Sequence, residues 1–261
     1  MRLYQSIWNG IDLVDISQDP SRLTRGTPNA LFYAEFYRRL RGAGYTLAPE
    51  WIRSRRTLSE RLRQWLARAA ASRGTVLAQE KILSLGAGLG MVEAPLIREG
   101  LDITLHEIAP EAFGLLPSLA ETKDLPGGIK TLVGPLENIP DRGFDIVFVG
   151  SCEYACRDDA DFARFLGQLH RILRDSGSVI SWDYVPTWRG WAEAILRRAL
   201  PPLFPDAVFW GVLRSPAARA VAYRDCGLEV MDTDILDADW RPGTPARYAV
   251  IHAKKQEKTF P

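Results

Sequence analysis

The sequence predicts an α/β protein built on a mostly parallel β-sheet that is flanked by helices. From Lys81 onward, short apolar runs alternate with amphipathic stretches, which is the pattern of parallel strands joined by crossover helices. Three glycines at alternate positions follow the first of these runs, as in a tight strand-to-helix turn. The chain is also 46% hydrophobic and 25% charged, the balance of a globular protein, and it has no apolar run long enough to cross a bilayer.

Seven strands are expected along the chain. They are Lys81–Leu85, Ile103–Glu107, Lys130–Val133, Asp145–Val149, Ser178–Asp183, Leu228–Ile235 and Arg247–Ala253. The fifth strand follows a segment in which Phe162, Leu166 and Leu169 recur at helical spacing, so a helix is expected there. Gly177 is expected to end this helix in the left-handed conformation.

The first 75 residues differ from the rest of the chain in charge. They hold 13 Arg, no Lys and 6 acidic residues, a net charge of +7, and the remaining residues hold 20 basic and 26 acidic residues, a net charge of −6. Two helices are expected here: one runs from an N-cap at Asn29 to a stop at Gly42, and one opens with the capping box TLSE at Thr57. We therefore expect an N-terminal helical cap or lid over residues 1–75 and a second domain over residues 76–261.

The glycine-rich turn predicts a ligand site. Gly86, Gly88 and Gly90 form G-x-G-x-G between a strand and a helix, so that backbone amides face whatever lies above the sheet edge. The dinucleotide fingerprint needs its third glycine one place later, where Met91 stands, so the spacing disfavours a pyrophosphate. Glu107, at the end of the second strand, is placed to accept both hydrogen bonds of a ribose diol.

From about Lys81 to the C-terminus these motifs resemble those of the class I S-adenosylmethionine-dependent methyltransferases. "LSLGAGLG" resembles the glycine motif of that family, "LHEIAP" the acidic end of its second strand, "GPLENIPDRGFDIVFVG" the approach to its fourth strand, and "LHRILRDSGSVI" the helix and turn before its fifth. The resemblance implies a Rossmann-like seven-stranded sheet of order 3-2-1-4-5-7-6 with an antiparallel seventh strand. It also implies S-adenosyl-L-methionine as the cofactor.

The resemblance further implies which residues contact the cofactor. The glycines would lie against its amino acid and ribose, and Glu107 would hold the ribose hydroxyls. The full set of expected contacts is Ser84, Gly86, Gly88, Gly90, Glu107, Leu136, Glu137 and Gly150. Two positions depart from the family pattern: Ser84 replaces an acid two places before the first glycine, and Pro135 stands where an aspartate often follows the third strand. Because Pro135 has no side-chain acceptor and no N–H, Glu137 or Asn138 would have to recognise the adenine amine.

Residues for the acceptor are expected after the fourth and fifth strands. Methyl transfer is a single in-line displacement that depends mainly on alignment, and a general base adds roughly 10² to 10⁴ in rate where the acceptor must lose a proton. Glu153 and Tyr154 follow the fourth strand, and Asp183 and Tyr184 end the fifth. In each pair one side chain is expected to point into the crevice, and the sequence leaves open which one. The candidates are Glu153, Tyr154 and Asp183 for catalysis, and Tyr33, Tyr37 and Tyr184 for substrate binding.

The function expected from these features is methyl transfer to an O or N atom of a small-molecule or biosynthetic intermediate, in a crevice covered by the N-terminal segment. Two alternatives stay open: an RNA-modifying methyltransferase that uses the Arg-rich segment, and a non-catalytic cofactor-binding protein. Three scattered Cys and three scattered His predict neither a disulfide framework nor a metal site. The N-terminal residues lack the features of a secretory signal, so a cytoplasmic protein without a membrane partner is expected. The oligomeric state is not predicted.

Overall fold

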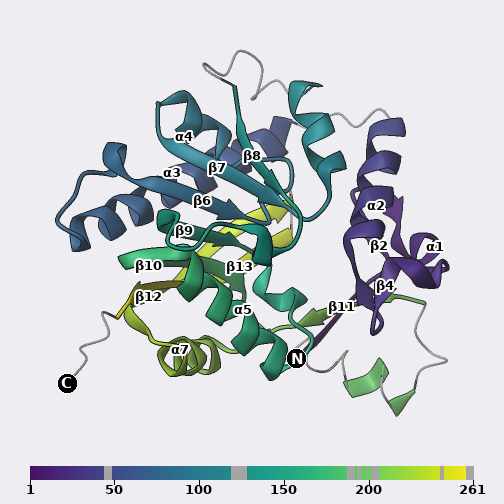
Figure 1. Ribbon diagram of the computed structural model, residues 1–261. Coiled ribbons are helices and arrows are strands. Elements are labelled where there is room, and N and C mark those ends of the chain that lie inside the picture. The colour runs from purple at the N-terminus through teal and green to yellow at the C-terminus, as the bar shows by residue number, and fades with distance from the viewer. Residues whose placement is uncertain are drawn as a thin grey trace.

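The computed structural model describes residues 1–43, 49–118, 128–186, 192, 195–197, 199–200, 206–241 and 244–256. Its centre is a seven-stranded sheet of order β12-β13-β10-β9-β6-β7-β8 (Figure 1). Numbered from β6 as the first strand, this is the predicted order 3-2-1-4-5-7-6. Strand β13 runs antiparallel to both of its neighbours, β10 and β12, and the other pairs are parallel. The predicted fold class is therefore confirmed.

All seven predicted strands are present. They are β6 (Lys81–Leu85), β7 (Asp102–Glu107), β8 (Lys130–Val133), β9 (Phe144–Gly150), β10 (Leu173–Tyr184), β12 (Leu228–Arg241) and β13 (Thr244–Lys255). The last two are longer than expected because they pair with each other over nearly their whole length. The central strands read as continuous apolar runs because helices cover both faces of the sheet.

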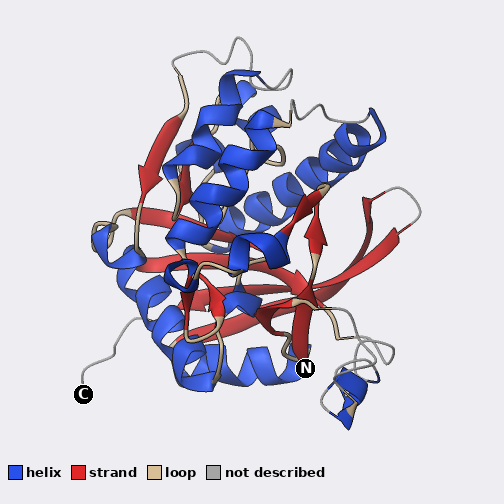
Figure 2. Ribbon diagram, turned by 90° about the vertical axis from the view of Figure 1, so that its right-hand side faces the viewer, coloured by secondary structure: helices blue, strands red, loops and turns tan. Residues whose placement is uncertain are grey.

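Helices pack on both faces of the sheet (Figures 1 and 2). The helices of the first face are α3 (Pro49–Ser72) and α4 (Ala94–Arg98), and those of the second are α5 (Asp159–Ile172) and α7 (Pro216–Asp225). Strand alternation divides the core between the faces: Phe148 lies in the same cluster as Leu62 of α3, and Val147 lies in the cluster of Leu166 of α5. The connecting turns include η2 (Leu77–Gln79), η3 (Pro110–Ser118), η4 (Leu136–Asn138) and η5 (Glu153–Ala155).

Two predicted helix boundaries are wrong. Helix α3 begins at Pro49, so Thr57 lies inside the helix and does not open a capping box. Helix α5 ends at Ile172, and the residue with a left-handed φ in the following turn is Ser176, at 59°, instead of Gly177. Gly177 is required for another reason, because a Cβ there would lie only 2.9 Å from the carbonyl oxygen of Arg174. Local patterns did not report these tertiary contacts.

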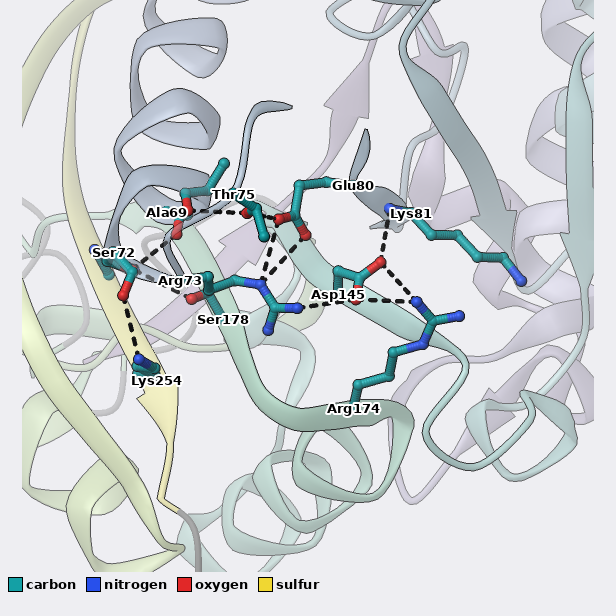
Figure 3. Close-up of polar contacts among 12 residues, drawn as sticks. Ala69, Ser72, Arg73, Thr75, Glu80, Lys81, Asp145, Arg174, Ser178 and Lys254 are labelled. Atoms are coloured by element: carbon teal, nitrogen blue, oxygen red, sulfur yellow. Dashed lines mark hydrogen bonds and ion pairs between the residues drawn. The ribbon is translucent and has the colours of Figure 1, made fainter. Parts of the chain in front are cut away.

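Charged residues fasten the end of α3 to the amino-terminal ends of the strands (Figure 3). Arg73 donates a 3.0 Å hydrogen bond to Asp145 and forms a 3.3 Å ion pair with Glu80. Arg174 reaches the same carboxylate at 2.9 Å, and the backbone N–H of Lys81 donates to it at 2.9 Å. These contacts join α3, β6, β9 and β10 at the sheet edge opposite the glycine turn.

Helix α3 therefore packs against the sheet, although it precedes the predicted domain boundary at residue 75. Two more of its arginines pair with acids of the later part of the chain: Arg63 with Glu99 at 3.1 Å and Arg68 with Asp232 at 3.8 Å. The opposite charges of the two parts of the sequence are thus partly used inside the molecule. The division at residue 75 stays a prediction.

The N-terminal segment contains strands as well as helices. Strand β1 (Arg2–Gln5) pairs antiparallel with β11 (Val208–Val212), about 200 residues later in the chain. The remaining elements up to α2 are β2 (Ile7–Trp8), β3 (Ile11–Asp12), α1 (Leu13–Ser17), η1 (Pro20–Arg22), β4 (Leu23–Thr24) and β5 (Thr27–Pro28). Figure 1 shows them grouped with α2 at one side of the sheet. The sequence predicted only helices here, because the partner that forms β1 is distant in the chain.

Helix α2 (Ala30–Gly42) begins as predicted. The side chain of Asn29 accepts hydrogen bonds from the backbone N–H groups of Leu31 and Phe32 at 2.9 and 3.2 Å. The apolar face of the helix, including Phe32 and Phe36, belongs to the same core cluster as the α3 face of the sheet. Helix α2 is therefore packed against the sheet domain.

Candidate functional site

The candidate site lies at the carboxyl ends of β6, β7, β9 and β10, the edge at which open parallel sheets bind ligands. In the turn after β6, Gly86, Gly88 and Gly90 have φ angles of 64°, 58° and 61°. Residues with a side chain are strained in this left-handed region. A Cβ on Gly90 would also lie 2.8 Å from Cδ1 of Leu105. The backbone conformation therefore requires glycine at all three positions, and packing requires it at Gly90.

Glu107, the last residue of β7, is buried beside this turn. One carboxylate oxygen accepts a 2.7 Å hydrogen bond from the backbone N–H of Gly88, and the other accepts a 3.1 Å bond from the N–H of Ile108. Burial raises the pKa of Glu107 to about 7, and the two N–H groups oppose this shift. The structure thus brings the predicted acid into direct contact with the glycine turn.

A second buried acid flanks the turn on the side of β6. The hydroxyl of Ser84 donates a 2.6 Å hydrogen bond to Oε1 of Glu93, and the two residues are 1% and 3% exposed. Glu93 directly precedes α4. Burial raises its pKa, and the Ser84 hydroxyl is the largest influence in the opposite direction. Glu93 was not among the predicted site residues, because no glycine motif includes an acid at its position.

The expected contacts after β8 lie in η4. Leu136 packs partly against the core cluster of the α5 face, and its carbonyl oxygen accepts a 2.7 Å hydrogen bond from Arg171. Glu137 is exposed. The loop before η4 is joined to the site through Gly134, whose N–H donates a 3.0 Å hydrogen bond to the carbonyl oxygen of Glu107.

The chain after β9 touches the glycine turn. Gly150 ends the strand, and a Cβ on Gly86 would lie 3.1 Å from the Cβ of Cys152. Burial raises the pKa of the Cys152 thiol, and the nearby Asp183 carboxylate raises it further, so the thiol is protonated at neutral pH. Cys152 is a neighbour of the site that the sequence did not single out.

Glu153 and Tyr154 point in different directions, as expected for adjacent residues. Glu153 is 1% exposed and forms a 2.6 Å ion pair with Arg219 of α7. Its carboxylate also accepts hydrogen bonds from the hydroxyls of Ser181 and Tyr223. Both carboxylate oxygens are therefore engaged on the α7 face of the sheet. Arg219 ties this cluster to the strands through a 3.0 Å hydrogen bond to the carbonyl oxygen of Ala249.

Asp183 lies near the tip of β10, between this cluster and the turn after β9. Its carboxylate accepts a 2.9 Å hydrogen bond from the N–H of Tyr184 and another from the backbone of Tyr154. Burial raises the pKa of Asp183 well above its usual value; the charge of Arg219 opposes this shift, and that of Glu153 adds to it. An aspartate in this setting exchanges a proton more readily near neutral pH than an exposed one does.

Tyrosines line the same edge. The ring centroid of Tyr154 lies 6.2 Å from that of Tyr184, which in turn lies 4.9 Å from that of Tyr248. Burial raises the pKa of the Tyr154 hydroxyl, which also accepts a hydrogen bond from the side chain of Trp210 in β11. Trp210 was expected in a loop, and the pairing of β11 with β1 places it here instead.

Helix α2 carries Tyr33 and Tyr37 to this edge. The ring of Tyr33 packs 5.9 Å from that of Trp210, and the hydroxyl of Tyr37 lies 3.6 Å from the point that a Cβ on Gly88 would occupy. Burial raises the pKa of both hydroxyls, and the charge of Glu107 adds to each shift. The structure therefore joins the predicted tyrosines to the glycine turn and its acid, and α2 lies over the cofactor side as well as the acceptor side.

Within the parts of the chain that the structure describes, no helix is long and apolar enough to span a membrane. The same residues contain no group of three or more His, Cys, Asp or Glu arranged to hold a metal ion.

Residues 83–181 match the methyltransferase domain family. A demethylmenaquinone methyltransferase of Deinococcus radiodurans is 25% identical over 182 residues, which cover 68% of this chain and 72% of that protein. An uncharacterized methyltransferase of Mycobacterium tuberculosis is 30% identical over 134 residues, which cover 50% of this chain and 48% of that protein. The match thus spans about half of the mycobacterial relative.

Solved structures with the same fold include two at 16% identity. Magnesium protoporphyrin IX methyltransferase from Synechocystis, with bound S-adenosylhomocysteine, has a TM-score of 0.61 over 85% of this chain and 94% of that chain. A methyltransferase from Methanosarcina mazei has a TM-score of 0.60 over 72% and 98% of the two chains. Together with the family match over residues 83–181 and the strand order of the sheet, these likenesses show that the chain belongs to the class I, Rossmann-like S-adenosylmethionine-dependent methyltransferases.

Proposed function

We propose that this protein transfers a methyl group from S-adenosylmethionine to an O or N atom of a small molecule. The observation that carries the proposal is the pair of buried acids, Glu107 and Glu93, on either side of the glycine turn. S-adenosylmethionine carries positive charge on its sulfonium and ammonium groups, which these acids favour. A pyrophosphate would instead meet Glu107, which already accepts the N–H of Gly88.

The residues present fit this cofactor in the places that the family resemblance implies. Glu107 has two acceptor oxygens for the ribose hydroxyls, and the glycine turn leaves no side chain over Gly86 and Gly88. Gly150 lies at the end of the neighbouring strand β9. Leu136, Glu137 and Asn138 are proposed for the adenine side, because the loop that holds them is hydrogen-bonded to the backbone of Glu107.

Bound S-adenosylmethionine supplies an electrophilic methyl group, and the chain must align an acceptor with it and remove water. We assign Asp183 to accept the proton that an acceptor hydroxyl or amine loses, because it is buried near the tip of β10 and its pKa is raised. Tyr154 and Tyr184, which flank Asp183, would orient the acceptor. Glu153 acts at a distance as a positioning residue, since it holds Arg219 and Ser181 on the other face of the sheet.

Tyr33 and Tyr37 would complete the wall around the acceptor. They come from α2, whose apolar face is part of the protein core, so the aromatic wall is held in place by packing. Aromatic walls exclude water and favour planar groups and cations. This arrangement supports a small acceptor enclosed by the N-terminal segment.

The names of relatives and structural neighbours also favour a small acceptor. They include a methyltransferase of magnesium protoporphyrin IX and one that methylates N1 of 1,6-didemethyltoxoflavin. The Arg-rich segment, by contrast, spends several of its charges internally, for example between Arg39 and Glu35 at 2.8 Å and between Arg63 and Glu99 at 3.1 Å. An RNA-binding role for this segment is therefore the weaker proposal.

Calorimetry and a transfer assay test the proposal. The purified protein should bind S-adenosylhomocysteine and should bind NAD at least tenfold more weakly. It should also move a labelled methyl group from S-adenosylmethionine to members of a panel of phenols and amines. Tighter binding of NAD than of S-adenosylhomocysteine would overturn the cofactor assignment, and cofactor binding without transfer to any compound would favour a non-catalytic role.

A further inference from the structure

Ser84 occupies the position where related methyltransferases carry an acid, two residues before the first glycine of the turn. The structure places an acid beside it from another part of the chain. Glu93 lies nine residues after Ser84, past the whole glycine turn, and its Oε1 accepts the Ser84 hydroxyl at 2.6 Å. The carboxylate that is absent from β6 is thus present in space, held by the residue that replaced it.

The surroundings of Glu93 leave its negative charge incompletely compensated. The residue is 3% exposed, and the Ser84 hydroxyl and the backbone N–H groups of Val92 and Glu93 stabilise the ionised form. Arg55 of α3 adds a positive charge at longer range. Burial nevertheless outweighs these influences and raises the pKa of Glu93. A cationic group at this place would therefore gain a favourable interaction that the protein alone does not supply.

Glu93 and Glu107 also act on each other across the glycine turn. The charge of Glu93 contributes to the raised pKa of Glu107, so the two buried carboxyl groups are close enough to repel. Glu107 lies on the side of β7, where a ribose is expected, and Glu93 lies at the β6 side of the same turn. A cation beside Glu93 would relieve this repulsion.

We propose that Glu93, held in place by Ser84, supplies the negative charge that recognises the ammonium group of the amino-acid part of S-adenosylmethionine. This inference rests on the proposed function and adds a recognition residue to it. Glu93 takes over, from the start of α4, the task of an acid at the end of the first strand. The pair Ser84 and Glu93 is then equivalent to a single acid at position 84.

Calorimetry with two ligands tests the role of the ammonium group. The ligands are S-adenosylhomocysteine and its deamino analogue, in which hydrogen replaces the ammonium group. Wild-type protein should bind S-adenosylhomocysteine about ten to a hundred times more tightly than the analogue, the range expected for a buried charge-assisted hydrogen bond. In Glu93→Gln, which keeps the size of the side chain, the two ligands should bind with affinities within about threefold. Glu99→Gln, at an exposed acid just after α4, is the matched control and should behave as wild type.

A swap of the acid tests the equivalence of the two positions. The double variant Ser84→Asp, Glu93→Ser should recover most of the preference for S-adenosylhomocysteine, because the carboxylate returns to β6 and the hydroxyl moves to position 93.

Three outcomes would overturn the inference. Glu93→Gln could keep the full preference for the ammonium group, or it could lose affinity equally for both ligands, which would make Glu93 a support of the turn only. Equal binding of the two ligands by wild-type protein would also exclude the role, even if the variants did not fold. Each of these results leaves the proposed function intact, whereas wild-type protein that binds neither ligand would overturn both.

Discussion

Gly211 of β11 lies directly against the backbone of Tyr154, so closely that a Cβ on Gly211 would be 1.8 Å from the carbonyl oxygen of Tyr154. Gly211 pairs with Leu3 of β1, and Tyr154 lies in η5, the turn after β9. The N-terminal strand is thus connected through β11 to the turn that carries a candidate acceptor residue. This contact explains how a segment at the beginning of the chain can shape the site.

The first prediction concerns this contact. Gly211→Ala should push β11 away from η5, lower the melting temperature and reduce methyl transfer at least tenfold, while the affinity for S-adenosylhomocysteine changes by less than about threefold. Turnover, calorimetry and thermal unfolding measure the three effects. Gly167→Ala in α5 is the control, since a Cβ there meets no atom within 4 Å, and it should be neutral or slightly stabilising. Full turnover in Gly211→Ala would show that β11 does not position η5.

Gly88→Val tests the close approach of ligand and backbone. The valine side chain should overlap the cofactor and abolish binding of S-adenosylhomocysteine, although the protein still folds, because the nearest atom to a Cβ is the Tyr37 hydroxyl at 3.6 Å. Backbone strain alone is controlled by Gly100→Val, since Gly100 also has a positive φ of 94° but stands in open space. Binding that survives in Gly88→Val and matches that of Gly100→Val would move the cofactor away from this turn.

Glu107→Gln should weaken binding of S-adenosylhomocysteine by about 1–3 kcal/mol, through loss of charge-assisted hydrogen bonds to the ribose. The ionised carboxylate is the better acceptor, so the affinity of wild-type protein should rise with pH through about 7, the pKa of Glu107. In the variant this part of the pH dependence should disappear. An affinity that is flat between pH 6 and 8 in wild-type protein would contradict the assignment.

The stability of the ligand-free protein should show the opposite trend. The pKa of Glu107 is about 7 in the folded protein and 4.5 as its model value, so between these values the folded state binds a proton that the unfolded chain has lost. Stability therefore falls as the pH rises through this window. Measured by denaturant unfolding, the difference between Glu107→Gln and wild type should move in favour of the variant by about 1–3 kcal/mol from pH 5 to pH 8. A constant difference would show that Glu107 is ionised throughout.

Asp183→Asn tests the proposed proton acceptor. The amide keeps the shape of the side chain and cannot take a proton, so turnover on an acceptor that loses a proton in the transition state should fall by roughly 10² to 10⁴. Affinity for S-adenosylhomocysteine should be nearly unchanged. Turnover close to that of wild type across the pH range would assign the protein to acceptors that need no base.

Asp145→Asn tests the ionic network at the other edge of the sheet. The variant leaves Arg73 without its full partner and weakens the link between α3 and the strands, so the free energy of unfolding should fall by roughly 3 kcal/mol. The exposed pair of Asp102 with Lys130 provides the control, and Asp102→Asn should cost less than about 1 kcal/mol. Cofactor affinity of the folded protein should not change in either variant. Equal stability of the two variants would show that the network contributes no more than a surface pair.

Several features of this protein are determined by local sequence alone. The apolar runs predicted every strand of the central sheet, because strands covered on both faces leave a continuous apolar signal. The three glycines predicted a left-handed turn, because no other residue adopts that backbone without strain. Asn29 predicted the start of α2, because its cap contacts lie within three residues of it. Each of these signals is short in range, and so it can be read from neighbouring residues.

Tertiary structure decided the features that depend on distant partners. The pairing of β1 with β11 joins segments about 200 residues apart and has no local pattern. The directions of Glu153 and Asp183 follow from Arg219, a residue of α7 that no motif connects to them. Glu93 meets Ser84 only because the glycine turn folds back on β6. The sequence therefore determined the sheet and the glycine turn, whereas the partners of each buried charge were set by folding, because a charge in the interior is stabilised by whichever groups the packed chain brings to it.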